Sequence, residues 1–386
     1  MEQPVNTPAV PDKPALMKRA YNRAGISMLV QYQSLQMIGS IFVVIAAVIV
    51  SFVLIVPRLQ GDVRLSMDSI MTLLRETGGI RWILLVYVLG MIVGMTVGLL
   101  IIRKILTERV PLEKKSLSLG QFLVVALMTY GLWGIGVLIG NLPMFFGVTE
   151  SNGMDELLNG LKTEAIPMYL YMVIGAPIFE ELACRKFLLD RLHPYGEGFA
   201  MLVSALLFGL IHGNSGQFFL AFFIGLLFAM VYMRTGRIVY TMLLHGMINL
   251  TATLPEFFAL ADIDILLGWN IAVIALGVIG MIVLLLRKKA HDPLLSPTVS
   301  DFAGATNATW RNPGMIIMRV FGLVTLVTTD LLMLAMSLLN EQSAWALLRL
   351  PISALALVTV LLLPKFSKRF EQPAEVQQNE SKSLIP

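Results

Sequence analysis

Residues Ala176 to Leu192 read Ala-Pro-Ile-Phe-Glu-Glu-Leu-Ala-Cys-Arg-Lys-Phe-Leu-Leu-Asp-Arg-Leu. The stretch ends an apolar run that begins near Ile166, and it carries two adjacent carboxylates, Glu180 and Glu181, where residues that face lipid are expected. A charged side chain at the centre of a membrane helix costs about 2.5–3.5 kcal/mol on insertion scales, so such residues are rare and usually functional. The stretch therefore predicts a membrane-spanning helix that carries a chemical site.

The two carboxylates have different neighbours along the helix. Glu181 precedes Arg185 by four residues, which is the favourable order for an ion pair on a helix. Glu180 points about 100° away from that pair. The pairing neutralises one acid and leaves Glu180 free, and a free carboxylate can serve as a base.

The composition excludes an ordinary soluble domain. The chain has 386 residues, of which 56% are hydrophobic and only 14% charged, whereas charged residues make up about a quarter of a typical soluble domain. The apolar residues come in runs of roughly twenty, long enough to cross a bilayer. We therefore predict an all-α fold, a polytopic membrane helical bundle with the lipid bilayer as its main partner.

The sequence supports neither a disulfide bond nor a nucleic-acid partner. Cys184 is the single cysteine, which excludes an intramolecular disulfide. The chain has no basic patch interleaved with aromatic residues, so a nucleic-acid partner is not expected. The sequence leaves the oligomeric state open.

About ten spanning helices are predicted. Their ranges are 37–56, 82–102, 121–140, 166–192, 199–213, 216–234, 237–255, 265–286, 314–338 and 344–364. The fifth is short and the seventh marginal, and both carry polar groups, so we expect neighbouring helices to shield them from lipid. Gly90, Gly94 and Gly98 share one face of the second span, which favours close packing inside the chain over a dimer contact.

Basic residues are concentrated in alternate loops. They follow the second, fourth, sixth and eighth spans and recur in the tail, whereas 141–165, 256–264 and 339–343 hold few. Because cytoplasmic loops are rich in Lys and Arg, both termini are predicted to be cytoplasmic. The expected location is a bacterial plasma membrane. The exception is 57–81, which holds four arginines and is interpreted as an amphipathic helix on the outer surface.

The chain divides into seven predicted segments. They are a cytoplasmic N-terminal segment (1–36), an N-terminal transmembrane region (37–164), a core with the site (165–255), an eighth transmembrane helix (256–286), a cytoplasmic linker (287–313), an accessory helix pair (314–364) and a disordered cytoplasmic tail (365–386).

Polar groups of three spans fall at one depth. A rise of about 1.5 Å per residue places Glu180 and Asn249 about 18 Å, His212 about 20 Å and His245 about 12 Å from the cytoplasmic ends of their helices. Randomly scattered polar residues would not be expected to align in this way. The pattern therefore favours a shared site.

Each of these residues also has a simpler interpretation. A single histidine in a membrane helix often binds a backbone carbonyl, and Asn249 alone could join two helices. The Glu181–Arg185 pair is interpreted as structural rather than catalytic, and Cys184 as a small apolar filler. Only the combination of an acid, two imidazoles and a carboxamide indicates a site.

At this point the sequence resembles a known family, the CPBP intramembrane proteases, also called the CAAX protease and bacteriocin-processing or Abi family. The resemblance covers about residues 165–255 and rests on three motifs, Glu180-Glu181-x-x-x-Arg185, Phe208-x-x-x-His212 and His245-x-x-x-Asn249. It implies an all-helical membrane core with a CAAX-protease-like arrangement and hydrolysis of a peptide bond at or in the membrane.

The resemblance also implies residue roles. Glu180 and His212 would activate water, and His245 and Asn249 would complete the site. Glu181 and Arg185 would support it, and Phe208 would pack beneath it. The physical chemistry agrees, since amide hydrolysis needs a base for water and donors for the oxyanion, and Asn249 with a His245 N–H can supply the donors.

The cofactor requirement is left with two alternatives. Glu180, His212 and His245 are a suitable ligand set for a catalytic zinc ion, as in a metalloprotease. A glutamate-activated water without metal fits the same residues and is the preferred interpretation, so no cofactor is firmly expected.

Two other functions compete with an endopeptidase. A membrane carrier or channel could use the same groups as a proton or ion relay, with Asp330 as a further relay group, and a catalytically inactive relative could act as a scaffold. The substrate cannot be deduced. Candidates are a prenylated tail, a secreted peptide precursor and a membrane-anchored protein.

Overall fold

The computed structural model describes residues 13–58, 67–106, 109–140, 166–258, 263–290, 294, 305–339 and 349–368. These residues form helices and the turns between them, with no strand in the described ranges. The N-terminal helices are α1 (Lys13–Val50), continued by η1 (Ser51–Ile55) and η2 (Val56–Arg58), α2 (Met67–Glu76), α3 (Gly79–Ile105) and α4 (Leu119–Gly140).

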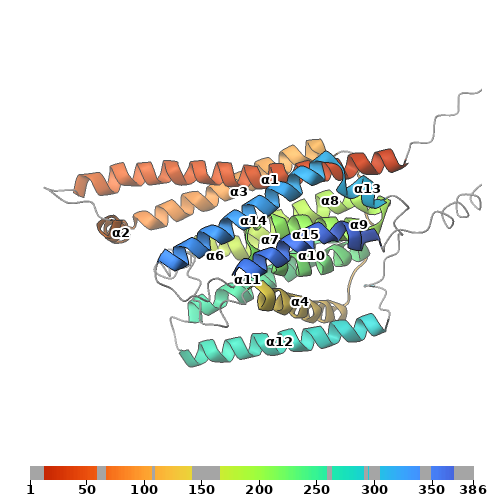
Figure 1. Cartoon of the computed structure of the whole chain (residues 1–386). Coiled ribbons are helices and arrows are strands. Elements are labelled where there is room, and N and C mark those ends of the chain that lie inside the picture. Colours follow the sequence, from red (N-terminus) through yellow and green to blue (C-terminus); the bar gives the residue numbers. More distant parts are fainter. Residues whose placement is uncertain are drawn as a thin grey trace, which may run out of the picture.

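The central and C-terminal helices complete the bundle (Figure 1). The central ones are α6 (Ile166–Leu170), η4 (Tyr171–Gly175), α7 (Ala176–Glu181), η5 (Leu182–Phe187), α8 (Leu188–Leu192), η6 (His193–Tyr195), α9 (Glu197–Leu210), α10 (Ser215–Thr235) and α11 (Ile238–Phe258). The C-terminal ones are α12 (Ile263–Lys289), α13 (Ala305–Trp310), α14 (Pro313–Leu339) and α15 (Arg349–Ser367).

The all-α membrane architecture predicted from the sequence is confirmed. In the described ranges, 8 helices are long and apolar enough to cross a membrane, and Glu197–Leu210 and Ile238–Leu254 are shorter apolar helices. Together they match the predicted spans, including the two that were expected to be short or marginal.

Several predicted boundaries differ from the observed helices. α1 begins at Lys13 and not near residue 37, because Met17, Tyr21, Ala24 and Met28 are fully buried and form one apolar face before the lipid-length run. The predicted linker 287–313 contains the end of α12 and the short helix α13, and the tail begins within α15. Most of the predicted loops 141–165 and 339–343 lies outside the described residues.

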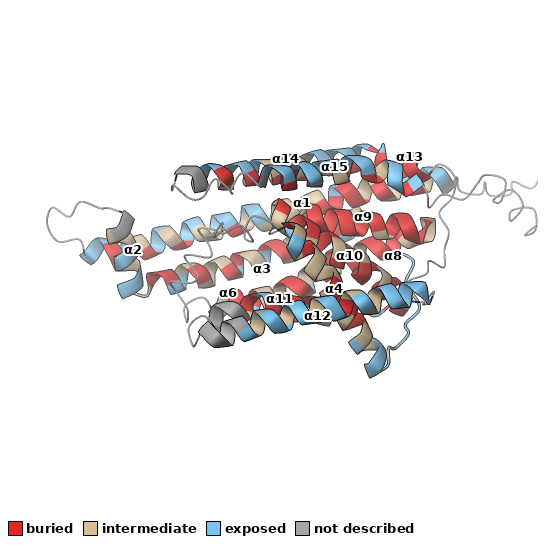
Figure 2. Cartoon of the chain, turned by 60° about the horizontal axis from the view of Figure 1, so that its bottom comes forward, coloured by how far each residue is buried: buried red, intermediate tan, exposed pale blue. Residues whose placement is uncertain are grey.

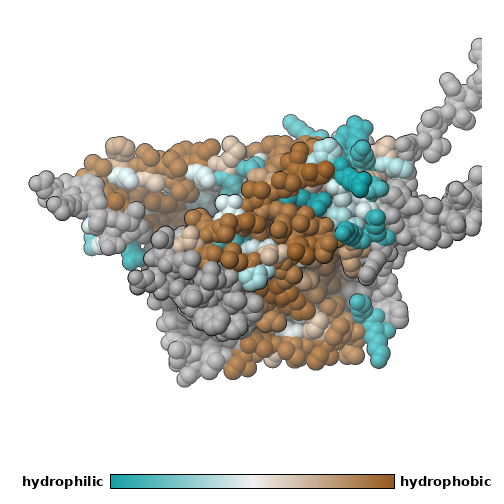
Figure 3. Space-filling view, viewed as in Figure 1, coloured by the Kyte–Doolittle hydropathy of each residue, from teal (hydrophilic) through white to brown (hydrophobic). Residues whose placement is uncertain are grey.

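The amphipathic helix expected within 57–81 is present as α2. It lies at the far end of the α1–α3 pair from the start of α1 (Figure 1). The start of α1 and the end of α15 lie together at the opposite end of the bundle, where hydrophilic side chains also gather (Figure 3). The rest of the visible described surface is mostly apolar, as a lipid-facing surface requires.

Glycines allow the N-terminal helices to pack closely inside the chain. The Gly90, Gly94 and Gly98 face of α3 packs on α1, where a Cβ at Gly94 would lie 2.7 Å from the Ser34 carbonyl oxygen. The interpretation of this face as an internal contact is therefore correct.

Buried side chains concentrate on α8, α9 and α10, while α12 exposes its outer face (Figure 2). α10 packs between α4 and α9. The hairpin formed by α9 and α10 is therefore shielded from lipid by protein. The arrangement explains how α9 tolerates polar residues at its end although it is shorter than a bilayer.

A segment between α3 and α4 ties the hydrophilic ends of these helices together. The Val110 N–H donates to the Asp190 carbonyl (2.7 Å) and the Lys115 N–H to the Thr235 carbonyl (2.8 Å). The Asp190 carboxylate is fully buried and accepts from Arg109 Nε (2.7 Å) and Tyr232 Oη (2.6 Å). We call residues 109–118 the strap, because they join α3 and α4 to α8 and α10.

The close contact between α12 and α4 gives a first testable prediction. A Cβ at Gly280 would lie 1.8 Å from the Leu127 carbonyl oxygen, so Gly280→Ala must push the helices apart. We expect a loss of about 1–3 kcal/mol of stability, measured as a lower Tm of the detergent-solubilised protein. Gly268→Ala in the same helix is the control, because a Cβ there meets nothing within 4 Å. Equal Tm values for the two variants would contradict this packing.

Candidate active site

The segment from Ile166 to Tyr195 is not a uniform helix. Two π-helical turns, η4 and η5, stand on either side of α7, which carries Glu180 and Glu181 at its end. Isolated π turns inside α-helices often occur at functional sites. The sequence predicted one regular helix over 166–192, and it gave no signal for these turns.

Pro177 leaves one carbonyl of the first π turn, η4, without a backbone donor, so a side chain of another helix must supply one. At the end of η4 the Ala176 N–H bonds to the Tyr171 carbonyl, five residues back. The Met172 carbonyl would bond residue 177 in the same pattern, but proline has no N–H. Asn249 Nδ2 of α11 donates to that carbonyl instead, at 2.7 Å. One N–H of Asn249 is thus committed to backbone and the other remains for the site.

A buried ion pair lies next to the site. Glu181 and Arg185 are both fully buried, and Arg185 Nε lies 3.2 Å from Glu181 Oε2, as the helical spacing predicted. The other oxygen, Glu181 Oε1, lies 3.2 Å from His245 Nδ1. The sequence analysis missed this contact, because the two residues are 64 positions apart and neither has a local signal for the other.

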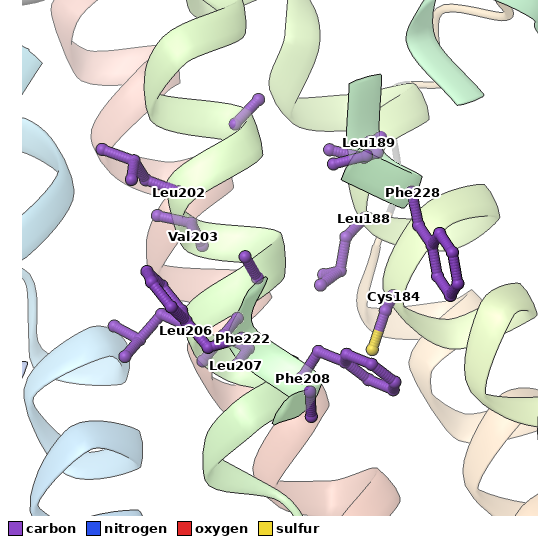
Figure 4. Close-up of a cluster of buried hydrophobic side chains, with 14 of the residues drawn as sticks. Cys184, Leu188, Leu189, Leu202, Val203, Leu206, Leu207, Phe208, Phe222 and Phe228 are labelled. Atoms are coloured by element: carbon purple, nitrogen blue, oxygen red, sulfur yellow. The ribbon is translucent and has the colours of Figure 1, made fainter. Parts of the chain in front are cut away.

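Phe208 is the common apolar neighbour of these groups. The Arg185 guanidinium carbon lies 4.3 Å from the Phe208 ring centroid and 5.5 Å from that of Phe228. The Phe208 ring also meets His212 edge-on at 5.1 Å and His245 at 5.6 Å. Figure 4 shows Phe208 and Phe228 with Cys184 at one end of the buried apolar cluster. Packing of Phe208 under the polar groups agrees with the prediction.

Glu180 has a different environment from its neighbour. Its side chain is 16% exposed, and Oε2 lies 3.8 Å from His245 Nε2. Among the described residues, Oε2 is buried and has no hydrogen-bond partner. Such an atom is costly unless a ligand or water binds it.

His212 lies in a turn and not in a helix. α9 ends at Leu210, so the predicted span 199–213 was too long. His212 Nδ1 is 2.7 Å from the Phe208 carbonyl oxygen. Because a carbonyl only accepts, Nδ1 carries the proton and Nε2 is left as the acceptor of a neutral ring.

His245 is held in the same way. Its Nδ1 faces the Glu181 carboxylate and its Nε2 faces Glu180. Both imidazoles are therefore anchored through Nδ1 and have Nε2 for chemistry. Donation from His245 Nε2 to an oxyanion then requires a proton on that nitrogen as well.

The alternative metal site would use Glu180, His212 and His245 as ligands. Both histidines have the hydrogen bonds that metal-binding imidazoles usually have. However, the His, Cys, Asp and Glu side chains in the described ranges form no group of three that could hold an ion.

Ser204 and Cys184, which lie near the site, have structural roles. Ser204 Oγ is buried and donates to the Cys184 carbonyl at 2.8 Å. Cys184 itself is fully buried. Neither residue faces an imidazole through a contact in the described region, so a water nucleophile fits the site better than a covalent one.

Comparison with known proteins matches the part of the chain that carries these residues. Residues 162–251 match the family model described as Type II CAAX prenyl endopeptidase Rce1-like. The match supports a protease of the CPBP family. The matched segment includes every motif residue from Glu180 to Asn249, whereas α1–α4 and α12–α15 lie outside it.

A curated protein with a similar sequence points to a membrane peptidase as well. The protein named "Putative membrane peptidase YdiL" of Bacillus subtilis (strain 168) is 28% identical over 166 residues, which cover 42% of this chain and 67% of that protein. No solved structure matches the chain. The family supports a peptidase, and the apolar helices support an integral multi-pass membrane protein.

The buried ion pair gives a second prediction. Glu181→Ala leaves the Arg185 guanidinium buried without its carboxylate, which we expect to cost about 3–5 kcal/mol. The Tm in detergent should fall accordingly. Glu113→Ala, which breaks an exposed pair with Lys115, is the control and should leave the Tm unchanged. A Glu181→Ala protein as stable as wild type would contradict the interpretation.

The Asn249–Met172 bond gives a third prediction. Asn249→Ala leaves the Met172 carbonyl without its donor, and we expect a loss of about 1–3 kcal/mol. Pro177→Ala restores an N–H near that carbonyl, so the double variant should lose less stability than the sum of the single ones. Thermal unfolding of all four proteins measures this coupling. Strict additivity would show that proline and asparagine act independently.

Proposed function

We propose that this chain is an intramembrane endopeptidase in which the Glu180 carboxylate activates a water molecule for attack on a peptide bond. The observation that carries the proposal is the buried Glu180 Oε2, which lacks a hydrogen-bond partner among the described residues and lies 3.8 Å from His245 Nε2. A water molecule between these groups would satisfy the oxygen and would be deprotonated by it.

The proposed reaction follows from the protonation states of the site. Glu180 takes a proton from water as hydroxide attacks the carbonyl carbon, and the carbon–oxygen double bond becomes an oxyanion. Glu180 then gives that proton to the departing amine as the carbon–nitrogen bond breaks. His212, with a free Nε2, holds the same water and orients its lone pair toward the substrate.

Stabilisation of the oxyanion is assigned to α11. Protonated His245 donates through Nε2, and Asn249 donates through the amide N–H that Met172 does not use. These residues are one helical turn apart and face the same segment. Each donor of this kind contributes about 2.7–4 kcal/mol to the transition state in known hydrolases.

Glu181, Arg185 and Phe208 keep the donors in place. Glu181 fixes the His245 ring through Nδ1, and Arg185 neutralises Glu181. Phe208 packs against both histidines and the guanidinium. The apolar surroundings keep bulk water away and strengthen the electrostatic interactions of the site.

Substrate and orientation are part of the same proposal. The substrate is a peptide or membrane-anchored protein, with a prenylated tail, a secreted precursor or a membrane-anchored regulator as candidates. The described chain ends lie at one end of the bundle with the hydrophilic side chains, which supports termini on one side of the membrane (Figures 1 and 3). We propose that this side is cytoplasmic, because basic residues gather in the alternate loops, and that the membrane is a bacterial plasma membrane.

The fourth prediction tests the base. Glu180→Gln keeps the side-chain volume but cannot take a proton, so cleavage should fall by about 10²–10⁴-fold with an unchanged Tm. The assay uses purified protein in proteoliposomes with a prenylated peptide and with a transmembrane peptide, and Glu113→Gln is the exposed control.

Mass spectrometry of membranes containing wild type or Glu180→Ala identifies the protein that accumulates uncut.

The outcomes separate the alternatives. Wild-type cleavage rates in Glu180→Gln would overturn the proposed base. Loss of activity in a chelator, with recovery on adding zinc, would overturn the metal-free mechanism. Proton or ion flux without cleavage of either peptide would favour the carrier, and the absence of both would favour a scaffold.

A further inference from the structure

The turn that carries His212 joins α9 to α10. α9 has 14 residues, about 21 Å of helix, which is less than the roughly 30 Å hydrocarbon core. Gly213 follows with φ +69, and α10 starts at Ser215. The first N–H groups of α10 have no partner within the helix and need acceptors from other residues.

Two side chains bind these N–H groups. Asn214 Oδ1 accepts from the Gln217 N–H at 2.9 Å. Asp330 Oδ1, from α14, accepts from the Ser215 N–H at 3.2 Å. Asp330 is 2% exposed, and its second oxygen accepts from Ser353 Oγ of α15. An intramembrane acid from a distant helix thus caps the helix that begins three residues after His212.

α14 also packs against the turn at two further places. Gly322 faces Leu210, where a Cβ on the glycine would lie 2.9 Å from the Leu210 Cβ. A Cβ at Gly213 would lie 3.2 Å from Thr325 Cγ2 and 3.6 Å from Tyr32 Oη of α1. Residues before, within and after the turn are therefore held by helices outside the matched segment 162–251.

We infer that Asp330 is a positioning residue for His212, and that α14 and α15 serve to fix the α9–α10 turn so that the His212 ring keeps its orientation. This inference rests on the proposed function. Its physical basis is that the His212 Nδ1 bond to Phe208 orients the ring only while the turn that joins them keeps its shape.

The required chemistry at position 330 is an oxygen acceptor in a short side chain. A negative charge adds a favourable interaction with the start of α10. An asparagine side chain retains the oxygen and loses the charge, whereas alanine loses both. The two substitutions therefore separate capping from general packing.

The test combines kinetics with a readout of the His212 ring. Asp330→Ala should lower kcat by about 10²-fold through misplacement of the histidine, and KM should stay within about twofold because no substrate contact is removed. Asp330→Asn should restore most of the activity. The protein has 4 histidines, so selective ¹⁵N-histidine labelling gives few signals, and the His212 signal should shift in Asp330→Ala and return toward wild type in Asp330→Asn.

Ser367→Ala is the matched control. Ser367 accepts a buried hydrogen bond from Trp310 Nε1 at 2.8 Å, within the same group of helices but 14 residues along α15 from Ser353. This variant should lose stability while kcat and the His212 signal remain those of wild type. An unshifted His212 signal and wild-type kcat in folded Asp330→Ala would overturn the inference, as would an equal shift in Ser367→Ala.

The outcome is distinguishable from failure of the proposed function. If wild type cleaves no substrate, the proposed function fails, while the histidine signal still decides whether Asp330 holds the turn. If wild type cleaves and Asp330→Ala does so equally well, only the inference about Asp330 fails.

Discussion

The buried pair of Glu181 and Arg185 is the constraint on which the site depends. Two charges without solvent access must each find a partner at close range, or the cost exceeds what one domain can supply. The guanidinium lies against Phe208 and Phe228, and the carboxylate reaches His245. The contacts that compensate this one ion pair therefore hold α7, α9, α10 and α11 together. The adjacent acid, Glu180, is left without that compensation, and this contrast is the origin of its proposed reactivity.

The irregular backbone of the segment from Ile166 to Tyr195 also helps to hold α11 next to the two acids. Pro177 removes one N–H from the membrane interior, and Asn249 supplies the missing donor from another helix. A regular helix would have no free carbonyl at Met172 and no reason to bind α11 there. The defect thus fixes the distance between the helix that bears the acids and the helix that bears His245.

Local sequence patterns were sufficient for the number of membrane-spanning helices and for the contact between Glu181 and Arg185. Apolar runs gave the spans, because the bilayer sets their length, and the four-residue spacing gave the Glu181–Arg185 pair. The contacts of Glu181 with His245, Asn249 with Met172 and Asp330 with Ser215 join residues 64, 77 and 115 positions apart. Such contacts depend on how helices pack, and single-sequence periodicity contains no information about that. The relay role considered for Asp330 also loses support, since both its oxygens accept hydrogen bonds.

The strap formed by residues 109–118 has a consequence for protein engineering. Its backbone bonds to Asp190 and Thr235 join the preceding helices to the ends of α8 and α10. α10 also lies against α4, where a Cβ at Gly136 would sit 2.4 Å from the Leu220 Cα. An excised fragment limited to the motif-bearing residues would expose these contact faces and lose their hydrogen bonds. The smallest autonomous unit of this molecule is therefore considerably larger than the stretch that bears its chemistry.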